Sequence, residues 1–427
     1  MQTSLRGIAK RASSHKGHRF RNLYGLLNEE HLHWCWSSLR KDAAPGVDAV
    51  DYKAYQENLE GNIHDLVERL KRKRYRAKLV RRRYIPKLNG KMRPLGIPAT
   101  EDKLLQVAVA KILEAIYEAD FLDNSYGYRP GRSPQQAAED LNRSLHYGKY
   151  CWIVDADIKG FFDNIDHDWL MKMLEQRIDD RALLQLIRKW LKAGILEPNG
   201  QVAHPVTGTP QGGIVSPILA NIYLHYALDL WFERKVGPRC RGTATIIRYA
   251  DDFVCAFQHR SEAESFYDEL GERLGKFGLA LAPDKTHLIR FCRYDFKGSR
   301  RFEFLGFEYY WARTRSGYPG VKRRTSRTKL RASVATFSAW IKRSRGIRVS
   351  RVLSTLKAKY RGYFNYYGII GNSASVGQFF FLTQRILYKW LNRRSQRRSY
   401  TWVGFQDLLV AFSIRGPRFK KGPVRSG

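Results

Sequence analysis

The spacing of apolar residues divides the chain into stretches that predict helices and stretches that predict strands. Apolar residues recur at helical spacing over much of residues 1–75 and again over 102–121. Short apolar runs at 150–158 and 243–257 predict buried strands, and the pattern is helical again from about residue 327. Because strands and helices alternate irregularly before a purely helical end, we expect an α+β fold with an all-α C-terminal part.

A tight turn is predicted between residues 84 and 98. Asn89-Gly90 lies between two segments of extended character, 84–86 and 93–98. Asn-Gly favours the two-residue turns that join antiparallel strands, because both residues tolerate positive φ angles. This segment therefore predicts a β-hairpin.

The net charge of the chain indicates the kind of partner that it binds. The 427 residues include 76 Lys+Arg and 40 Asp+Glu, which gives a net charge of +36. Residues 312–427 hold 27 of the basic residues and a single acid, Asp407. A chain this basic usually binds a polyanion, most often nucleic acid. We therefore expect nucleic acid as the partner, held mainly by the C-terminal quarter.

Other classes of protein are disfavoured. No window approaches the roughly 18 consecutive apolar residues of a membrane span. No apolar run follows the basic N-terminus, so we expect no secretory signal. The five cysteines are scattered and form no C-x-x-C motif, namely Cys35, Cys151, Cys240, Cys255 and Cys292. We therefore expect neither a disulfide framework nor an ordinary structural zinc site, and we expect a cytoplasmic protein.

Acidic residues interrupt two of the predicted strands. Asp157 ends one apolar run, and Asp251-Asp252 lies within another. Two carboxylates about 4 Å apart repel by about 4 kcal/mol at an effective dielectric of 20, so a cluster would shift its pKa values or bind divalent cations. Oxygen ligands select Mg²⁺ or Mn²⁺, and two such ions can support in-line phosphoryl displacement. Alternatively, an Asp-Asp pair in a turn is only a turn.

Further motifs, in a fixed order along the chain, favour the catalytic interpretation. They are Ile-Pro-Lys with Arg-Pro-Leu-Gly-Ile-Pro at 85–98, Ser-Tyr-Gly-Tyr-Arg-Pro-Gly-Arg-Ser at 125–133, Asp-Ile-Lys-Gly-Phe-Phe-Asp at 157–163, Gly-Thr-Pro-Gln-Gly-Gly-Ile-Val-Ser-Pro at 208–217, Tyr-Ala-Asp-Asp at 249–252, Ala-Pro-Asp-Lys-Thr at 282–286, Phe-Leu-Gly-Phe at 304–307 and Arg-Gly-Tyr-Phe-Asn-Tyr-Tyr at 361–367. With these eight blocks, the chain resembles the reverse transcriptases encoded by bacterial group II introns.

The resemblance implies a right-hand polymerase fold. Residues 1–150 would form an N-terminal extension and the fingers, and residues 151–311 a palm with an antiparallel sheet. Residues 312–392 would form an all-α thumb, the maturase domain X, and residues 393–427 a short basic tail that binds DNA.

The resemblance also implies an activity and partners. The expected enzyme is an RNA-directed DNA polymerase that uses two Mg²⁺ ions, which Mn²⁺ can replace. Its partners would be intron RNA as template and ribozyme, target DNA as primer, and dNTPs. Alternatives are a splicing maturase with little polymerase use and an intron-type enzyme co-opted for host defence. Many relatives end in a nuclease domain with paired cysteines; because no Cys or His follows Cys292, we expect no endonuclease activity in this chain.

Individual residues receive roles from the resemblance. The catalytic residues are Asp157, Asp251 and Asp252, which bind metal together with Ile158. Asp155 is a lesser candidate, since it faces the same side of its strand as Asp157. The nucleotide-binding residues are Lys87, Arg93, Phe162, Gln211, Gly212 and Lys285. The primer- and template-binding residues are Leu305, Gly306, Arg361, Arg393, Arg394, Arg397 and Arg398.

These roles are chemically reasonable, although some have simpler alternatives. Lys87 as a point charge and Arg93 as a fork can both bind a triphosphate. The ring of Phe162 would clash with a 2′-OH and favour deoxynucleotides, or it only packs in the core. Lys285 could protonate the leaving pyrophosphate or be solvated. Leu305-Gly306 could hold the primer end or be a strand with a Gly bulge. We assign most aromatic rings of the C-terminal helices to packing.

Overall fold

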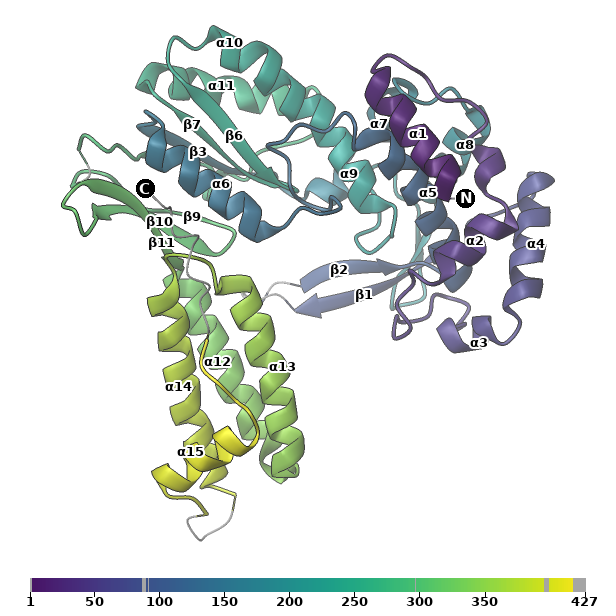
Figure 1. Cartoon of the computed structure of the whole chain (residues 1–427). Coiled ribbons are helices and arrows are strands. Elements are labelled where there is room, and N and C mark those ends of the chain that lie inside the picture. The colour runs from purple at the N-terminus through teal and green to yellow at the C-terminus, as the bar shows by residue number, and fades with distance from the viewer. Residues whose placement is uncertain (1, 87–89, 91, 296, 395–398, 418–427) are drawn as a thin grey trace.

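The protein is seen here in a computed structural model, which describes residues 2–86, 90, 92–295, 297–394 and 399–417. Figure 1 shows helices of the N-terminal part beside a central sheet, and a helical bundle that projects from a smaller sheet. The predicted α+β fold with an all-α C-terminal part is confirmed.

The N-terminal helices surround one buried helix. They are α1 (Gln2–Ser14), α2 (Glu29–Trp36), α3 (Tyr52–Gln56) and α4 (Leu59–Lys71), with a short 3₁₀ turn at Tyr24–Leu26. The buried helix is α5 (Thr100–Tyr117), of which nearly every residue is buried, including polar residues of its first turns. Its apolar residues from Leu104 to Ile116 belong to the main core, and α1, α2 and α3 pack against the helix.

The predicted hairpin forms and joins a small sheet. Strands β1 (Val80–Pro86) and β2 (Met92–Ile97) pair antiparallel from Arg81↔Ile97 to Pro86↔Met92. The sheet continues through β4 (Ile195–Leu196) and β5 (Val202–Ala203) in the order β2-β1-β4-β5. The hairpin points from the N-terminal part toward the helical bundle (Figure 1).

A four-stranded antiparallel sheet forms the centre of the molecule. Its strands are β3 (Trp152–Asp157), β6 (Ala244–Tyr249), β7 (Asp252–Phe257) and β8 (His287–Arg290), in the order β6-β7-β3-β8. Helix α6 (Pro134–Tyr147) covers one face and α11 (Arg260–Gly275) the other (Figure 1). The apolar runs predicted as strands are thus buried between helices.

Along the chain, further helices lie between β3 and β6 of this central sheet. They are α7 (His167–Glu175), α8 (Arg181–Leu191), α9 (Ser216–Leu224) and α10 (Gly237–Arg239), with π-helical turns at His225–Asp229 and Phe232–Val236 between the last two. Short 3₁₀ turns lie at Phe161–Asp163 and Pro283–Lys285.

A second, smaller sheet precedes the C-terminal helices. Strands β9 (Phe302–Phe304), β10 (Phe307–Arg313) and β11 (Pro319–Thr325) form a separate three-stranded sheet. The predicted boundary between 311 and 312 falls inside β10. The alternating apolar pattern of a strand continues on both sides of it. Helices begin at Arg327, where Ser326 caps the first turn.

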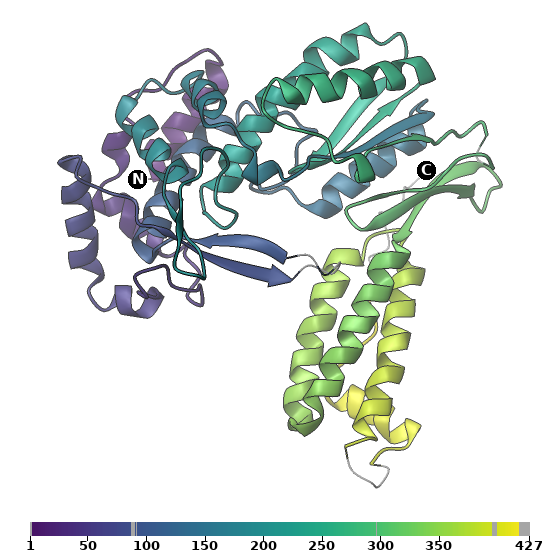
Figure 2. The same cartoon turned by 180° about the vertical axis from the view of Figure 1, so that it is seen from behind.

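Four helices form the bundle, which has a core of its own. They are α12 (Arg327–Arg343), α13 (Val349–Tyr367), α14 (Ser373–Leu391) and α15 (Trp402–Ala411), with a 3₁₀ turn at Ser344–Gly346. Figure 2 shows the bundle from behind. Phe405 and Leu409 of α15 are buried against the other helices. Within the described part of the predicted tail at 393–427, α15 thus contributes to the core of the bundle.

One expectation about cysteine is corrected. Cys151 and Cys292 form a disulfide, while Cys35, Cys240 and Cys255 are free. The pairing joins the start of β3 to the end of β8, where the backbone N–H of Phe291 also donates to the carbonyl of Cys151. The sequence does not indicate that these two cysteines lie close together, because they are 141 positions apart.

Membrane-spanning segments were also predicted to be absent. Within the described ranges, no helix has both the length and the apolar character that crossing a membrane requires.

Candidate active site

The predicted catalytic acids lie at one end of the central sheet. Asp157, the last residue of β3, is directly opposite Asp252, the first residue of β7. Tyr249 pairs with Asp252 across a two-residue turn, Ala250-Asp251, in which Ala250 has φ 58°. The strand register thus places Asp157 beside Asp252, and the tight turn carries Asp251 next to both.

The electrostatics of these carboxylates are unfavourable. Burial raises the pKa of Asp252 to about 7, and the charges of Asp157 and Asp251 contribute to the rise. Burial and the neighbouring acids, including Glu303, raise the pKa of Asp155 to about 8. The pKa of Asp251 is also raised, mainly by burial. Negative charge is therefore concentrated here beyond what the surroundings neutralise.

Oxygen ligands and excess negative charge fit a divalent cation. Across the part of the chain that the structure describes, no three His, Cys, Asp or Glu side chains converge closely enough to hold an ion. The Nζ atom of Lys285 lies 2.5 Å from Oδ2 of Asp157 and supplies positive charge to the cluster. This contact raises the pKa of Lys285. The donor set and its charge suit Mg²⁺ or a similar hard cation, which would relieve the same repulsion.

Ile158 directly follows the end of β3. Its neighbours hold the backbone in place, because Ala282 N–H donates to the carbonyl of Asp157 and Lys159 N–H donates to the carbonyl of Ala280. Its side chain is buried, so only its backbone could bind a metal.

The Gln-Gly loop is held between the fingers and the turn after β3. The N–H of Gly96 donates to the carbonyl of Gln211 over 2.6 Å, and the N–H of Thr209 donates to the carbonyl of Phe162 over 2.8 Å. Gly212 has φ 118°, and a Cβ atom there would lie 2.5 Å from the carbonyl oxygen of Gly96. The loop can dock this closely because residue 212 has no side chain.

The other predicted nucleotide-binding residues lie around the same space. Arg93 is exposed on β2, opposite Ile85, and its charge partly opposes the rise that burial causes in the pKa of Asp251. Phe162 is partly buried beside the fully buried Phe161, with the ring centroids 5.4 Å apart. Lys87 lies outside the described residues.

Tyr128 adjoins this space and was not predicted as a site residue. Its ring is edge-on to Phe162 with the centroids 6.3 Å apart, and its side chain remains 47% exposed. It has φ 59°, a left-handed conformation that non-glycine residues rarely adopt. Such strain is found preferentially at functional sites. The Ser-Tyr-Gly-Tyr-Arg-Pro block contains this residue, but no sequence pattern shows where its ring points.

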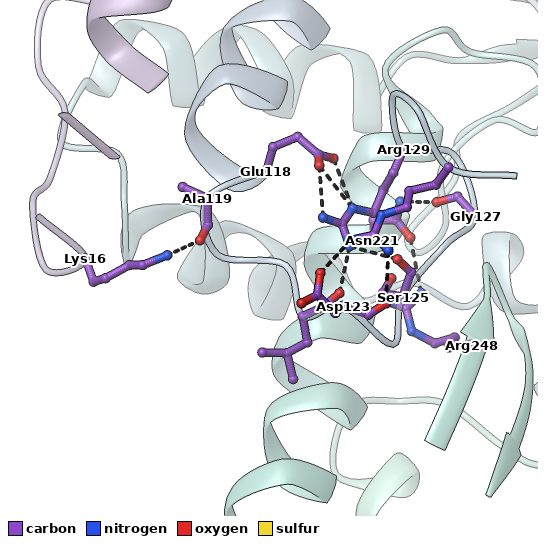
Figure 3. Close-up of polar contacts among 11 residues, drawn as sticks. Lys16, Glu118, Ala119, Asp123, Ser125, Gly127, Arg129, Asn221 and Arg248 are labelled. Atoms are coloured by element: carbon purple, nitrogen blue, oxygen red, sulfur yellow. Dashed lines mark hydrogen bonds and ion pairs between the residues drawn. The ribbon is translucent and has the colours of Figure 1, made fainter. Parts of the chain in front are cut away.

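A buried ion pair contacts the Ala250-Asp251 turn. Arg248 and Asp229 have fully buried side chains and are bonded through two nitrogen–oxygen contacts. Arg248 also donates to the carbonyl of Ala250 over 3.0 Å and to Ser125 Oγ over 2.7 Å. Figure 3 shows Arg248 and Ser125 meeting in this network. Arg248, the residue just before the Tyr249–Asp252 segment, thereby fixes the backbone of that turn.

The same network holds the Ser-Tyr-Gly-Tyr-Arg block against the turn. Asn221 of α9 accepts from Arg248 and donates to the carbonyl of Gly127 over 2.6 Å (Figure 3). A Cβ atom on Gly127 would lie 2.3 Å from the backbone nitrogen of Ala250. Position 127 therefore requires glycine. The close packing of Gly127 against Ala250 also fixes the backbone position of the next residue, Tyr128.

The Leu305-Gly306 turn joins β9 to β10. Leu305 and Gly306 have φ 51° and 76°, as a tight hairpin turn needs. Tyr366 Oη donates to the carbonyl of Leu305 over 3.1 Å, and a Cβ atom on Gly306 would lie 3.1 Å from Tyr367 Oη. The turn is thus held by the end of α13, the helix that also carries the exposed Arg361.

The bundle presents basic residues on several faces. A groove of about 680 Å³ between α12 and α14 is lined partly by Arg324, Arg327 and Arg331. Arg393 lies 5.9 Å from the ring centre of Trp390, and Arg394 follows it at the end of α14. The predicted contacts Arg397 and Arg398 lie outside the described residues.

Comparison with known proteins places the chain in a family. A model of the family "Reverse transcriptase (RNA-dependent DNA polymerase)" matches residues 85–309, more than half of the chain. The chain therefore belongs to the reverse transcriptase family. The predicted right-hand polymerase fold is confirmed by this membership. Reverse transcriptases generally use divalent metal ions.

Curated relatives include intron-encoded proteins. The group II intron-encoded protein LtrA of Lactococcus lactis subsp. cremoris is 42% identical over 243 residues, 55% of this chain and 40% of LtrA. Protein YkfC of Escherichia coli (strain K12) is 33% identical over 325 residues, 69% of this chain and 83% of YkfC. These relatives confirm the predicted resemblance to group II intron proteins, although the chain spans only 40% of LtrA.

A solved structure is also similar. Telomerase from Candida albicans, in complex with a fragment of telomeric RNA, matches with a TM-score of 0.44 and 14% identity, covering 85% of this chain and 68% of that one.

Proposed function

We propose that this protein copies RNA into DNA by two-metal nucleotidyl transfer. Asp157, Asp251 and Asp252, with the backbone of Ile158, would hold two Mg²⁺ ions, which Mn²⁺ could replace. The observation that carries the proposal is the direct pairing of Asp157 with Asp252 beside the Ala250-Asp251 turn. When bound, such ions lower the pKa of an attacking hydroxyl and neutralise charge on the transferred phosphoryl group.

The nucleotide would bind between the fingers and the catalytic turn. Arg93 and Lys87 would bind the triphosphate, and Gln211 and Gly212 would line its base and sugar. Phe162 would exclude a 2′-OH. Lys285, which already contacts Asp157, would hold a proton near the leaving pyrophosphate.

The primer and template would bind at the Leu305-Gly306 turn and along the bundle. Leu305 and Gly306 would hold the primer end, a role supported by the way α13 fixes their turn. The backbone contacts would come from basic residues of the bundle and the chain that follows it, namely Arg361, Arg393, Arg394, Arg397 and Arg398. The intron RNA would be the template, target DNA the primer, and the bacterial cytoplasm the location.

A second role, in intron splicing, is favoured by the bundle. Its groove between α12 and α14 combines arginines with apolar side chains, a surface suited to structured RNA. The name of LtrA, a group II intron-encoded protein, favours this role over recruitment to host defence.

The test is primer extension on an RNA template with Mg²⁺, run beside splicing of the intron RNA. We expect the protein to make cDNA and to promote splicing. If it promotes splicing but makes no cDNA, the polymerase proposal fails and the splicing role remains.

A further inference from the structure

Three highly exposed tyrosines lie away from the candidate active site. Tyr147, at the end of α6, is 72% exposed; Tyr294, after β8, is 74% exposed; and Tyr318, between β10 and β11, is 73% exposed. Rings this exposed contribute little to the core. One such ring on a surface needs no explanation, whereas a group of large apolar side chains indicates contact with a partner.

His146 brings the three segments together. Val321, close to Tyr318 along β11, donates its N–H to Nδ1 of His146 over 3.3 Å. Arg293, beside Tyr294, donates to the carbonyl of His146. Tyr147 is the next residue after His146, and their rings are in edge contact with the centroids 4.7 Å apart. His146 thus contacts each of the three segments that carry the exposed tyrosines, and we call this region the palm-edge surface.

The palm-edge surface lies at the opposite end of the strands from the candidate active site. Tyr147 precedes β3, which runs from Trp152 to Asp157, and Tyr294 follows β8, whose Arg290 pairs with Trp152. At about 3.3 Å per residue, the strand alone separates its two ends by about 17 Å. The tip of β10–β11 likewise lies at the far end of these strands from the Leu305-Gly306 turn, because β10 runs from Phe307, next to that turn, to Arg313, which pairs with Pro319.

The chain around these rings is strongly basic. Residues 287–325 contain ten Lys+Arg and three Asp+Glu. Two of the three acids are already ion-paired, Asp295 with Arg290 and Glu308 with both Arg301 and Arg324. The exposed positions next to the tyrosines include Lys297, Arg300 and Arg315. The excess of positive charge makes this surface complementary to a polyanion.

We propose that the palm-edge surface binds single-stranded RNA at a site separate from the polymerase cleft. Aromatic rings spaced among cations are the feature by which proteins bind unpaired nucleotides, because bases stack on rings while cations contact phosphates. The three tyrosines come from three separate segments, namely the end of α6, the chain after β8 and the turn between β10 and β11. Unpaired bases can stack on such separate rings, whereas the bases of a duplex are already stacked on one another. The proposal rests on the proposed function in that RNA is the partner.

The test measures RNA binding while the cleft is filled. The full chain is loaded with an RNA–DNA primer-template that ends in a dideoxynucleotide, plus the next dNTP, and titrated against a labelled 12-nucleotide single-stranded RNA. Three proteins are compared with wild type: the triple variant Tyr147→Ala/Tyr294→Ala/Tyr318→Ala, the same triple to Phe, and Phe381→Ala. Phe381 is a matched control because its ring is exposed on the bundle, with Arg385 beside it.

We expect the triple alanine variant to bind the RNA about tenfold or more weakly, because stacked rings carry much of such affinity. The triple Phe variant and Phe381→Ala should bind as wild type does, and all four proteins should extend an ordinary primer at the same rate. Equal binding by wild type and the alanine variant would overturn the proposal. So would loss of extension in parallel with loss of binding, or a wild-type dimer that the alanine substitutions dissociate. If wild type binds the RNA but extends no primer, the proposed polymerase function fails instead.

Discussion

At the scale of single residues, the candidate site combines charges that repel and a backbone that is strained. Asp155 and Asp252 have pKa values raised to about 8 and about 7, and Ala250 and Tyr128 have left-handed backbones. Features that destabilise a fold persist where function requires them. The acids could be predicted from the sequence because carboxylates in apolar runs are conspicuous. Tyr128 could not, since its position depends on Gly127 meeting Ala250 from a distant segment.

Tyr128 should influence nucleotide binding. Replacing it by Ala removes the ring that lies against Phe162, so we expect KM for dNTP to rise by about tenfold or less, with a smaller effect on kcat. Tyr128→Phe keeps the ring and should behave like wild type in steady-state primer extension. An unchanged KM in the alanine variant would show that the ring does not touch the nucleotide.

At the scale of elements, sequence patterns predict the long helices and central strands but not their limits. The helix pattern locates α5, α13 and α14. The boundary predicted near 312 lies inside a strand, because the strand that follows it, β11, is basic and its sequence resembles that of a surface segment. The π-helical turn His225–Asp229 has no sequence signature, yet it positions Asp229 for Arg248.

The Arg248–Asp229 pair should couple stability to catalysis. Arg248→Lys cannot form the two-point ion pair and leaves Asp229 poorly paired, which should cost about 3–5 kcal/mol of unfolding free energy. Because Arg248 also holds the carbonyl of Ala250, the rate of nucleotide addition should fall at temperatures where the variant is still folded. Thermal unfolding and single-turnover extension measure the two effects. A destabilised variant that adds nucleotides at the wild-type rate would show that the ion pair does not contribute to catalysis.

His225 should make stability depend on pH. Burial lowers its pKa from 6.5 to about 4, so the folded state binds fewer protons than the unfolded state between those values. This group's contribution to stability is therefore complete above about pH 6.5 and is lost as pH falls toward 4, by up to about 3 kcal/mol. His225→Phe removes the titration and should lose less stability between pH 7 and pH 5 in thermal unfolding. An equally steep loss in the variant would contradict this assignment.

At the scale of the whole molecule, charge and architecture coincide. The acids lie at the end of the central sheet, whereas the C-terminal bundle is basic and has its own core. The sequence predicts this division because charge composition does not depend on the fold. It does not predict that the bundle and the second sheet meet through Tyr366 and the Leu305-Gly306 turn, since that contact is tertiary.

Binding of nucleic acid should be strongly dependent on salt. If about 6–10 phosphates are bound, affinity for a primer-template should fall by about 10³–10⁵ between 50 and 200 mM salt. The salt slope is the decrease of log affinity per unit of log salt concentration. The double variant Arg327→Gln/Arg331→Gln changes two arginines in the groove of the bundle. We expect its salt slope to be smaller by about one for each phosphate that it no longer binds. Arg239→Gln with Arg260→Gln is the control, because these arginines pair with Glu269 and Glu264. Equal slopes in both double variants would place the phosphate-binding residues elsewhere.

The most direct test of the account is the rate of a single nucleotide addition on an RNA template by Asp251→Asn. The matched control is Asp284→Asn, an exposed acid next to Lys285 and outside the strand ends. We predict that Asp251→Asn is slower than wild type by about 10²–10³-fold or more while it binds the primer-template normally, and that Asp284→Asn is close to wild type. An Asp251→Asn enzyme that adds the nucleotide at the wild-type rate would contradict the assignment of the active site.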